Sequence, residues 1–546
     1  MAKTIGIVET KFGRVSGVPS DRPEYEGITC FKGIPYAAPP VGELRWKPPV
    51  DPAPWEGVRV CDTYAPMAYQ IMGSGIGFEP WGTDFYYMGH PKASEDCLYL
   101  NVVTGASGSG EKRPVYMWFH GGGLNTGYSY EIEFDGSELA KRGVVVVTVG
   151  QRLNVFGYLC CRQLSEEQGG KSGNYGLMDE VKALDWVYEN IAAFGGDPEN
   201  ITIGGQSGGT AKTGALAACP YQKGRVKRVI NQSALNWKTQ YPTVEEAEAQ
   251  TARYFEAIGL DPAISLAELR SLDASVFHKP LPQADFMDPK AVRMPGSMVV
   301  DGDFVESGDH VAMLEKYASV CDYLSGVNNG ESRMSKGFFL GGSEEITKEH
   351  FYEMAKALLG EELYRKYDFE NLCPVTDQTA NRVSRYLAAR GLSGGFSGFS
   401  SRYFGAYRKE KGDSGRAYAY LFSRIPPTRP EDELPGTRRQ KEYLLSWHSA
   451  ELWYTFASLR TDVPPARPWE ARDYELAKEM CDYWANFMKT GDPNGEGLAP
   501  WPEADAAMGW IDFGDETVVH EGKDALDALI GEYLLQNGVL PQAEKA

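Results

Sequence analysis

The sequence predicts an α/β fold with a large, mostly parallel central sheet and helices on both of its faces. Three observations lead to this prediction. Val144–Val149 is an unbroken β-branched run, typical of a strand that is buried on both faces. Asn200–Ile203 is a second predicted strand, and a tight glycine turn joins it to a small-residue helix that continues through Ala218. Between these strands, Asp179–Phe194 has apolar residues at helical spacing, so strands and helices alternate along the chain.

Further elements are predicted on both sides of this unit. The additional strands are Thr4–Val8, Gly13–Val18, Leu98–Val103, Pro114–Phe119, Val226–Ile230, Ala318–Ser325 and Arg416–Phe422. An aromatic-rich helix is predicted at Tyr474–Met488. Length alone would favour two to four domains. The motifs below favour a single domain over residues 1–546, with helical insertions around 240–315 and 340–440 at the edge of the sheet where its parallel strands end.

Composition excludes several classes of partner. The formal net charge is −20 at pH 7, which disfavours binding to nucleic acid phosphates and to anionic lipids. No stretch approaches the roughly 20 apolar residues that are needed to span a bilayer. The nine cysteines lack CxxC spacing, so neither a zinc site nor a disulfide framework is predicted. We expect no metal and no cofactor, reduced thiols, and a cytoplasmic protein that is a monomer or a homodimer.

The glycine turn after the second strand has the pattern G-x-S-x-G, from Gly205 to Gly209, with Ser207 at its centre. In the α/β-hydrolase fold this pattern forms a nucleophile elbow, where the serine lies on a sharp strand-to-helix turn and its neighbours must lack bulky side chains. The alternative is an ordinary glycine turn or a phosphate-binding loop. The predicted strand before the turn and the helix after it favour the elbow, with Ser207 as the nucleophile.

A second glycine motif, His120–Gly123, directly follows the predicted strand Pro114–Phe119. Motifs of this type supply backbone N–H donors to the oxyanion hole of lipases and esterases. We expect the donors to be the N–H groups of Gly122 and Gly123, together with that of Gly208. The alternative is a flexible loop, and His120 itself is predicted to be structural.

A serine nucleophile needs a histidine base and an acid, which follow it in that order in this fold. His448 lies where a loop enters an apolar helix, whereas the other histidines after Ser207 lie in polar or charged stretches, the first three resembling surface residues. Those competitors are His278, His310, His350 and His520. Glu331 follows a predicted strand, where the acid is expected, but other carboxylates compete with it on the residues alone. These are Asp301, Asp303, Asp309 and Asp322.

Together these motifs resemble the type-B carboxylesterase and cholinesterase family over almost the whole chain. The matching segments are Phe31–Trp46, Ser94–Val102, the glycine motif after His120, Arg152–Tyr158 and Phe194–Gly209. The resemblance implies a Ser–Glu–His triad with the acid at Glu331, in Gly-Val-Asn-Asn-Gly-Glu, and the base at His448, in His-Ser-Ala-Glu-Leu. It also implies two buried ion pairs, Arg45 with Glu95 and Arg152 with Asp179.

The sequence departs from the family pattern at three places. The family often has Glu before and Ala after the nucleophile, where this chain has Gln206 and Gly208. A neutral glutamine removes a buried charge beside the catalytic site. Secreted members also pair the cysteine that matches Cys97 with one upstream, where this chain has Pro66–Tyr69, so that disulfide is predicted to be absent.

The resulting hypothesis is a serine carboxylesterase that acts on a small-molecule ester. Two alternatives stay open: a non-catalytic binding protein on the same fold, and an amidase or carbamate hydrolase that uses the same site. Two interpretations of the aromatic residues stay open: they form an apolar or cation-binding wall for substrate, or they pack loops onto the body of the protein. These are the residues of the loop Phe78–Met88, Phe338, Phe339 and Trp453.

Overall fold

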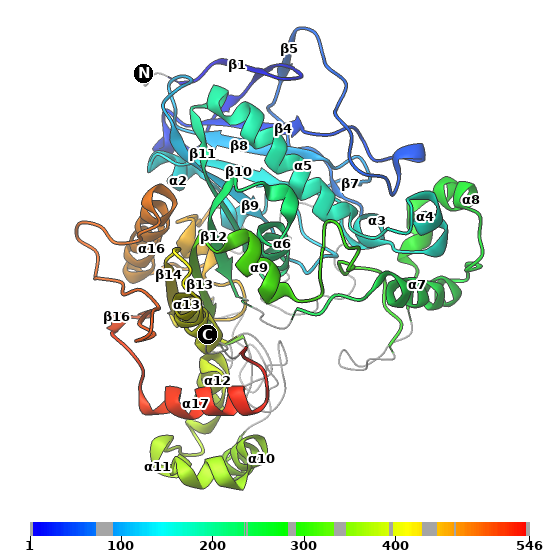
Figure 1. Cartoon of the computed structure of the whole chain (residues 1–546). Coiled ribbons are helices and arrows are strands. Elements are labelled where there is room, and N and C mark those ends of the chain that lie inside the picture. The colour runs from blue at the N-terminus through cyan, green and yellow to red at the C-terminus, as the bar shows by residue number, and fades with distance from the viewer. Residues whose placement is uncertain are drawn as a thin grey trace.

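The computed structural model describes residues 4–71, 91–233, 235, 239–281, 291–331, 346–392, 397–428, 445–462 and 466–541 (Figure 1). An eleven-stranded sheet crosses this part of the chain in the order β16-β15-β14-β13-β12-β11-β9-β10-β8-β4-β3. Every neighbouring pair from β15 to β10 is parallel, and the strands at both edges are antiparallel. The predicted mostly parallel sheet is therefore confirmed.

The strands of the central sheet are β3 (Val18–Pro19), β4 (Thr29–Pro35), β8 (Tyr99–Thr104), β9 (Arg113–Phe119), β10 (Val145–Val149), β11 (Gly196–Gln206), β12 (Val226–Gln232), β13 (Asp322–Asn328), β14 (Ala417–Phe422), β15 (Trp510–Phe513) and β16 (Thr517–His520). Two small sheets accompany it. They contain β1 (Ile7–Thr10), β2 (Gly13–Ser16) and β5 (Val58–Val60), and β6 (Met67–Ala68) and β7 (Ala93–Ser94).

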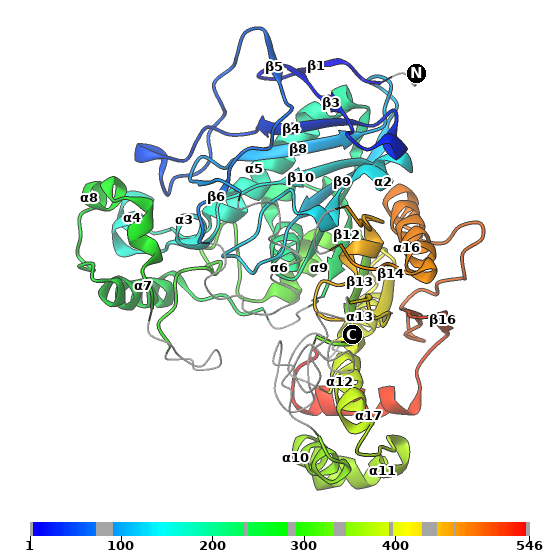
Figure 2. The same cartoon turned by 180° about the vertical axis from the view of Figure 1, so that it is seen from behind.

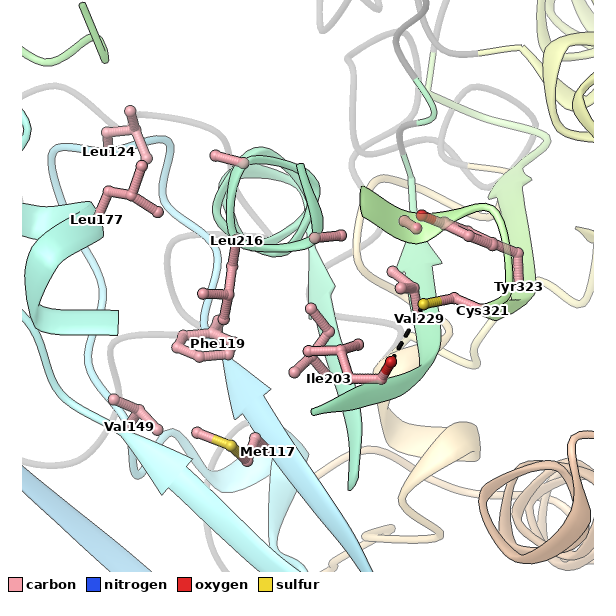
Figure 3. Close-up of a cluster of buried hydrophobic side chains, with 14 of the residues drawn as sticks. Met117, Phe119, Leu124, Val149, Leu177, Ile203, Leu216, Val229, Cys321 and Tyr323 are labelled. Atoms are coloured by element: carbon pink, nitrogen blue, oxygen red, sulfur yellow. Dashed lines mark hydrogen bonds between the residues drawn. The ribbon is translucent and has the colours of Figure 1, made fainter. Parts of the chain in front are cut away.

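Apolar cores lie on both faces of the sheet because successive side chains of a strand point to opposite sides. On β9, Val115, Met117 and Phe119 belong to one buried cluster, whereas Tyr116 and Trp118 belong to another. Figure 3 shows the first cluster, in which Leu216 of a covering helix lies above Phe119. Both faces are thus sealed from water, which accounts for strands without polar alternation.

The described helices are α2 (Ser137–Lys141), α3 (Asn154–Tyr158), α4 (Arg162–Glu167), α5 (Tyr175–Asn190), α6 (Gly208–Ala217), α7 (Val244–Ile258), α8 (Leu266–Ser271), α9 (His310–Ala318), α10 (Lys348–Lys366), α11 (Phe369–Leu372), α12 (Ala380–Arg390), α13 (Gly398–Lys411), α15 (Leu452–Thr455), α16 (Ala471–Thr490) and α17 (Ala525–Gln536). Helices α5 and α6 contribute to the first core and α15 and α16 to the second, so helices cover both faces of the sheet.

Long helical connections leave the sheet after β12 and after β13. The first contains α7, α8 and α9, and the second contains α10 to α13. Both views place α7 and α8 beside α3 and α4 at one side of the molecule, and α10, α11 and α12 beside α17 at its lower end (Figures 1 and 2). The assignment of the whole chain to a single domain stays a prediction.

Several predicted boundaries differ from those of the structure, and two of them are informative. Helix α5 begins at Tyr175 and not at Asp179, because the Asp179 side chain is engaged with Arg152 and does not cap a helix. Ala318 is the last residue of α9, and the strand that was predicted to begin there starts at Asp322. A turn separates the two, since the N–H of Cys321 donates to the carbonyl of Ala318.

Both ion pairs that the family resemblance implies are present. Arg152 contacts the Asp179 carboxylate through two nitrogens, at 2.8 and 2.7 Å, and both side chains are almost fully buried. Arg45 Nε lies 2.7 Å from the Glu95 carboxylate. Arg152 also donates to the carbonyl of Lys47 at 2.9 Å, so it ties the N-terminal segment to α5.

All nine cysteines, including Cys97, are free in the structure. No helix among the described residues has both the length and the apolar character that crossing a membrane requires.

Asp179→Ala is expected to lower the free energy of unfolding by about 3–5 kcal/mol, because it leaves the Arg152 charge buried without a counterion. The midpoint of thermal unfolding measures this loss. Glu166→Ala is the matched control, because the Arg162–Glu166 pair is exposed, with 81% and 63% of the two side chains accessible. Equal shifts of the two midpoints would contradict the assignment of a buried structural role to Asp179.

Candidate active site

Ser207 occupies the turn between β11 and α6. Its backbone has φ 57° and ψ −121°, a conformation that is costly for a residue with a side chain. The flanking glycines make the turn possible, since a Cβ on Gly205 would lie 2.4 Å from the carbonyl carbon of Gly209. The Ser207 N–H donates to the carbonyl of Gln232 on β12, which fixes the turn against the sheet.

The loop that begins at His120 passes directly beside this turn. A Cβ on Gly121 would lie 3.4 Å from the Ser207 Cβ, and one on Gly208 would lie 2.0 Å from the carbonyl oxygen of Gly123. Gly122 and Gly123 have φ values of 87° and 64°, in the left-handed region that favours glycine. The structure therefore brings the three predicted donor residues together next to Ser207.

The N–H groups of Gly122, Gly123 and Gly208 have no backbone acceptor among the described residues. Gly122 uses its carbonyl oxygen, which accepts from the N–H groups of Asn125 and Thr126. Within the described part of the chain, no backbone carbonyl accepts from the N–H of Gly122 or Gly123. Gly208 is the first residue of α6, where N–H groups have no partner inside the helix. The partial positive charge of the helix end adds to the same region.

Glu331 and His448 come from distant segments and meet near the carboxyl ends of the strands. Oε2 of Glu331 lies 3.4 Å from Nδ1 of His448, and each residue is only 3% exposed. The other carboxylate oxygen, Oε1, accepts from the N–H of Asn328 at 2.7 Å and from the hydroxyl of Ser233 at 2.6 Å. These two bonds hold the carboxylate in place beneath the imidazole.

The other ring nitrogen of His448 is close to the neighbour of Ser207. The side-chain nitrogen of Gln206 lies 3.2 Å from Nε2 of His448 and 3.5 Å from Nδ1. Gln206 is almost completely buried, at the end of β11. His448 thus contacts both the Glu331 carboxylate and the residue that precedes Ser207.

A second buried carboxyl, Glu451, lies beside Glu331 and was not predicted. Its oxygens accept from the side chains of Asn328 at 2.6 Å and Ser233 at 3.4 Å. The same Ser233 hydroxyl and the backbone N–H of Asn328 bind Glu331. Burial raises the pKa of Glu451 to about 7, and the charge of Glu331 adds to the shift. Its position three residues after His448, in the same His-Ser-Ala-Glu-Leu segment, was the available sequence signal.

The competing histidines lie away from this cluster. The prediction that His310 is a surface residue was wrong, because its ring is buried against Tyr241 and α6. The same prediction was wrong for His278, which is half-buried with its ring 5.2 Å from that of Tyr69. His350 is exposed, as predicted. His520 stacks on Trp510, and His120 donates to the carbonyl of Gly121.

The competing carboxylates have partners of their own. Asp301 accepts from Asn174, Asp303 from Tyr221, Asp309 caps α9, and Asp322 pairs with Arg416. The described residues contain no group of three or more histidine, cysteine or acidic side chains that could hold a metal ion.

Of the aromatic candidates, Trp453 packs in the core. It is 2% exposed, and its ring lies 5.7 Å from that of Trp469. The loop Phe78–Met88 and the residues Phe338 and Phe339 lie outside the described residues.

Glu451 makes the stability of the protein depend on pH. Its pKa is higher in the folded state than the ordinary value near 4.5, so the folded state holds this proton more tightly. Its contribution therefore destabilises the fold progressively as the pH rises from about 4.5 to about 7. This loss amounts to up to about 3 kcal/mol in the free energy of unfolding. We expect Glu451→Gln to remove it.

The measurement is thermal unfolding of wild type and variant at about pH 5 and about pH 8, on either side of the titration. Between these values, the midpoint of the variant should fall less than that of wild type. Glu349→Gln, on the exposed surface of α10, is the matched control and should follow wild type. Parallel behaviour of wild type and Glu451→Gln would contradict the shifted titration.

Comparison with known proteins agrees with this geometry. The family model described as "Carboxylesterase family" matches residues 5–527. The chain is 31% identical over 522 residues to the medium-chain fatty acyl-CoA hydrolase precursor of Anas platyrhynchos, covering 91% of this chain and 86% of that protein. It is 29% identical over 507 residues to the para-nitrobenzyl esterase of Bacillus subtilis, covering 91% and 92% of the two chains.

Solved structures give the same result. A para-nitrobenzyl esterase structure superposes with a TM-score of 0.70 at 26% identity, over 96% of this chain and 99% of the other. A carboxylesterase of Geobacillus stearothermophilus superposes with a TM-score of 0.69 at 28% identity, over the same shares of the two chains. The fold is thus that of the α/β-hydrolases, and the chain belongs to the carboxylesterase family and is a carboxylic ester hydrolase.

Proposed function

We propose that the protein is a serine carboxylesterase that works through an acyl-enzyme, with Ser207 as nucleophile, His448 as general base and Glu331 as the acid that orients the base. The observation that carries the proposal is the convergence of three separate segments beside one glycine-rich turn. Glu331 lies 3.4 Å from Nδ1 of His448, and the side-chain nitrogen of Gln206, next to Ser207, lies 3.2 Å from Nε2 of the same imidazole.

In the first half of the reaction, Nε2 of His448 takes the hydroxyl proton of Ser207 as its oxygen attacks the ester carbonyl. Glu331 stabilises the resulting imidazolium through Nδ1. The carbonyl oxygen becomes negative in the tetrahedral intermediate and accepts from the N–H groups of Gly122, Gly123 and Gly208. His448 then returns its proton to the leaving alcohol, and the acyl group stays on the serine.

In the second half, the same imidazole activates a water molecule that attacks the acyl-enzyme. The carboxylic acid leaves, and the serine regains its proton from His448. Every proton in this cycle moves through one histidine, so the scheme uses only side chains and backbone groups of this chain.

The names of the relatives suggest the class of substrate. The relatives include a fatty acyl-CoA hydrolase and a fumonisin B1 esterase, of Sphingopyxis macrogoltabida, which is 30% identical over 525 residues with 94% and 88% of the two chains covered. We propose a small-molecule ester as substrate. Parallel assays with p-nitrophenyl acetate and its anilide test ester against amide specificity. We also propose a cytoplasmic location, because all nine thiols are free.

Ser207→Ala is expected to lower kcat for p-nitrophenyl acetate by at least about 1,000-fold, because it removes the nucleophile. Labelling by a fluorophosphonate probe should disappear with it, which also separates an esterase from a binding protein of the same fold. Ser271→Ala, which changes an exposed serine of α8, is the control and should keep both activity and labelling. Substantial turnover by a folded Ser207→Ala protein would rule the mechanism out.

Gly208→Ala tests the tight approach of the oxyanion loop to the helix. The new Cβ would lie 2.0 Å from the carbonyl oxygen of Gly123, so the loop must move and its donors lose their alignment. We expect kcat to fall by about tenfold or more, with a smaller change in KM. Gly108→Ala is the matched control, since nothing lies within 4 Å of its added Cβ. Unchanged kcat in Gly208→Ala would show that the loop is not packed this closely during turnover.

A further inference from the structure

Lys212 is a fully buried lysine on α6, five residues after the nucleophile. Buried lysines are rare unless they have partners. Its Nζ donates to the carbonyl oxygen of His120 at 2.9 Å. This carbonyl belongs to the first peptide beyond β9, which leads into Gly121 and the glycine loop.

A second acceptor completes the lysine site. The amide of Gln151 satisfies both of its neighbours when its oxygen accepts from Nζ of Lys212 at 2.6 Å and its nitrogen donates to the Val149 carbonyl at 3.0 Å. Gln151 follows β10, which lies next to β9 in the sheet. The lysine thus connects the ends of two adjacent strands to the helix of the nucleophile.

Two buried carboxyls interact electrostatically with Lys212. Glu180 on α5 and Glu131 before the turn at Ile132–Phe134 both attract the charge of Lys212. Glu131 also accepts from the N–H of Tyr128 at 2.9 Å. Burial lowers the pKa of Lys212 and raises those of the two carboxyls, while the attraction between lysine and carboxyls favours their charged forms. Ammonium and amine both carry N–H donors, so the bond to His120 survives either state.

The glycine loop has no side chains with which to hold itself. Gly121, Gly122 and Gly123 present only backbone, and their N–H groups must stay aimed at one point to stabilise an oxyanion. The carbonyl of Gly122 is held by Asn125 and Thr126 at the far end of the loop. The near end is held by Lys212, through the carbonyl of His120.

We propose that Lys212 is a positioning residue of the oxyanion hole, which fixes the glycine loop to the helix that carries Ser207 and the third donor, Gly208. Helix α6 then positions the nucleophile and one donor directly, and it positions the other two donors through Lys212. This inference rests on the proposed function, and it assigns a role to a side chain that never touches the substrate.

Lys212→Met tests the inference, because it keeps the length of the side chain and removes the donor. We expect kcat for p-nitrophenyl acetate to fall by about 10- to 100-fold, with KM changed by less than about threefold. The reason is that the N–H groups of the loop stabilise a negative charge that develops only in the transition state, so substrate binding is little affected. The inhibition constant of an aryl trifluoromethyl ketone, whose adduct carries an oxyanion, should rise by a similar factor.

Two matched controls separate positioning from general destabilisation. Thr213→Val removes buried hydrogen bonding of the same helix, to Asn231 at 2.9 Å and to the carbonyls of Gly209 and Thr210, without touching the glycine loop. Glu180→Gln removes a buried charge beside Lys212 and keeps the bond to His120. Both controls should lower the unfolding midpoint without the selective loss of kcat.

The double variant Lys212→Met/Glu180→Gln removes charge and counter-charge together and is expected to fold even if the single variant does not. It should show the same loss of kcat. Wild-type kcat in either folded lysine variant would overturn the inference, as would failure of both to fold, which would make Lys212 a residue of the core. Ser207→Ala, assayed in parallel, keeps this outcome distinct from failure of the proposed mechanism.

Discussion

The close approach of three backbone segments at the end of β11 is the constraint on which the site depends. A Cβ on Gly205 would strike the carbonyl carbon of Gly209, and one on Gly209 would lie 2.1 Å from the carbonyl oxygen of Phe119. The turn is therefore locked against both its own helix and the neighbouring strand. Ser207 can hold its unfavourable backbone conformation because the surrounding packing leaves it no alternative.

The order of the strands turns this local constraint into a site. β11 lies between β9 and β12, near the middle of the sheet, and β13 lies one strand further on. Because these strands are parallel, the glycine loop after β9, the turn after β11 and Glu331 after β13 emerge at the same edge. His448 arrives from the connection after β14, and the carboxylate of Glu331 receives it there.

Much of this could be predicted from the sequence, and the failures have physical causes. The buried strands and the elbow were predictable because burial on both faces requires continuous apolar runs and the turn requires glycines at fixed spacing. Glu331 and His448 were identified through family resemblance, since isolated polar residues in loops carry little local signal. His310 was misjudged because a polar neighbourhood in sequence does not reveal what packs against a helix in space.

Lys212 was missed for a related reason. A lysine among small residues in a helix normally points to solvent, and only the tertiary structure shows that its helix is covered by α5 and α9. Its counter-charges come from Glu180, on another helix, and from Glu131, in a loop 81 residues earlier in the chain. No local sequence pattern predicts this pairing, because the lysine and each glutamate alone resemble ordinary surface residues.

The neutral side chain of Gln206 can be understood from the charges beneath the imidazole. Glu331 and Glu451 already place two buried carboxyls on one side of His448, and the repulsion between them contributes to the raised pKa of Glu451. A third carboxylate at position 206 would add like charge to the same poorly solvated region, where such interactions are weakly screened. Glutamine keeps the packing and hydrogen-bonding capacity of that position without the charge. The site thus groups its buried carboxyls at Glu331 and Glu451 and keeps position 206, next to Ser207, neutral.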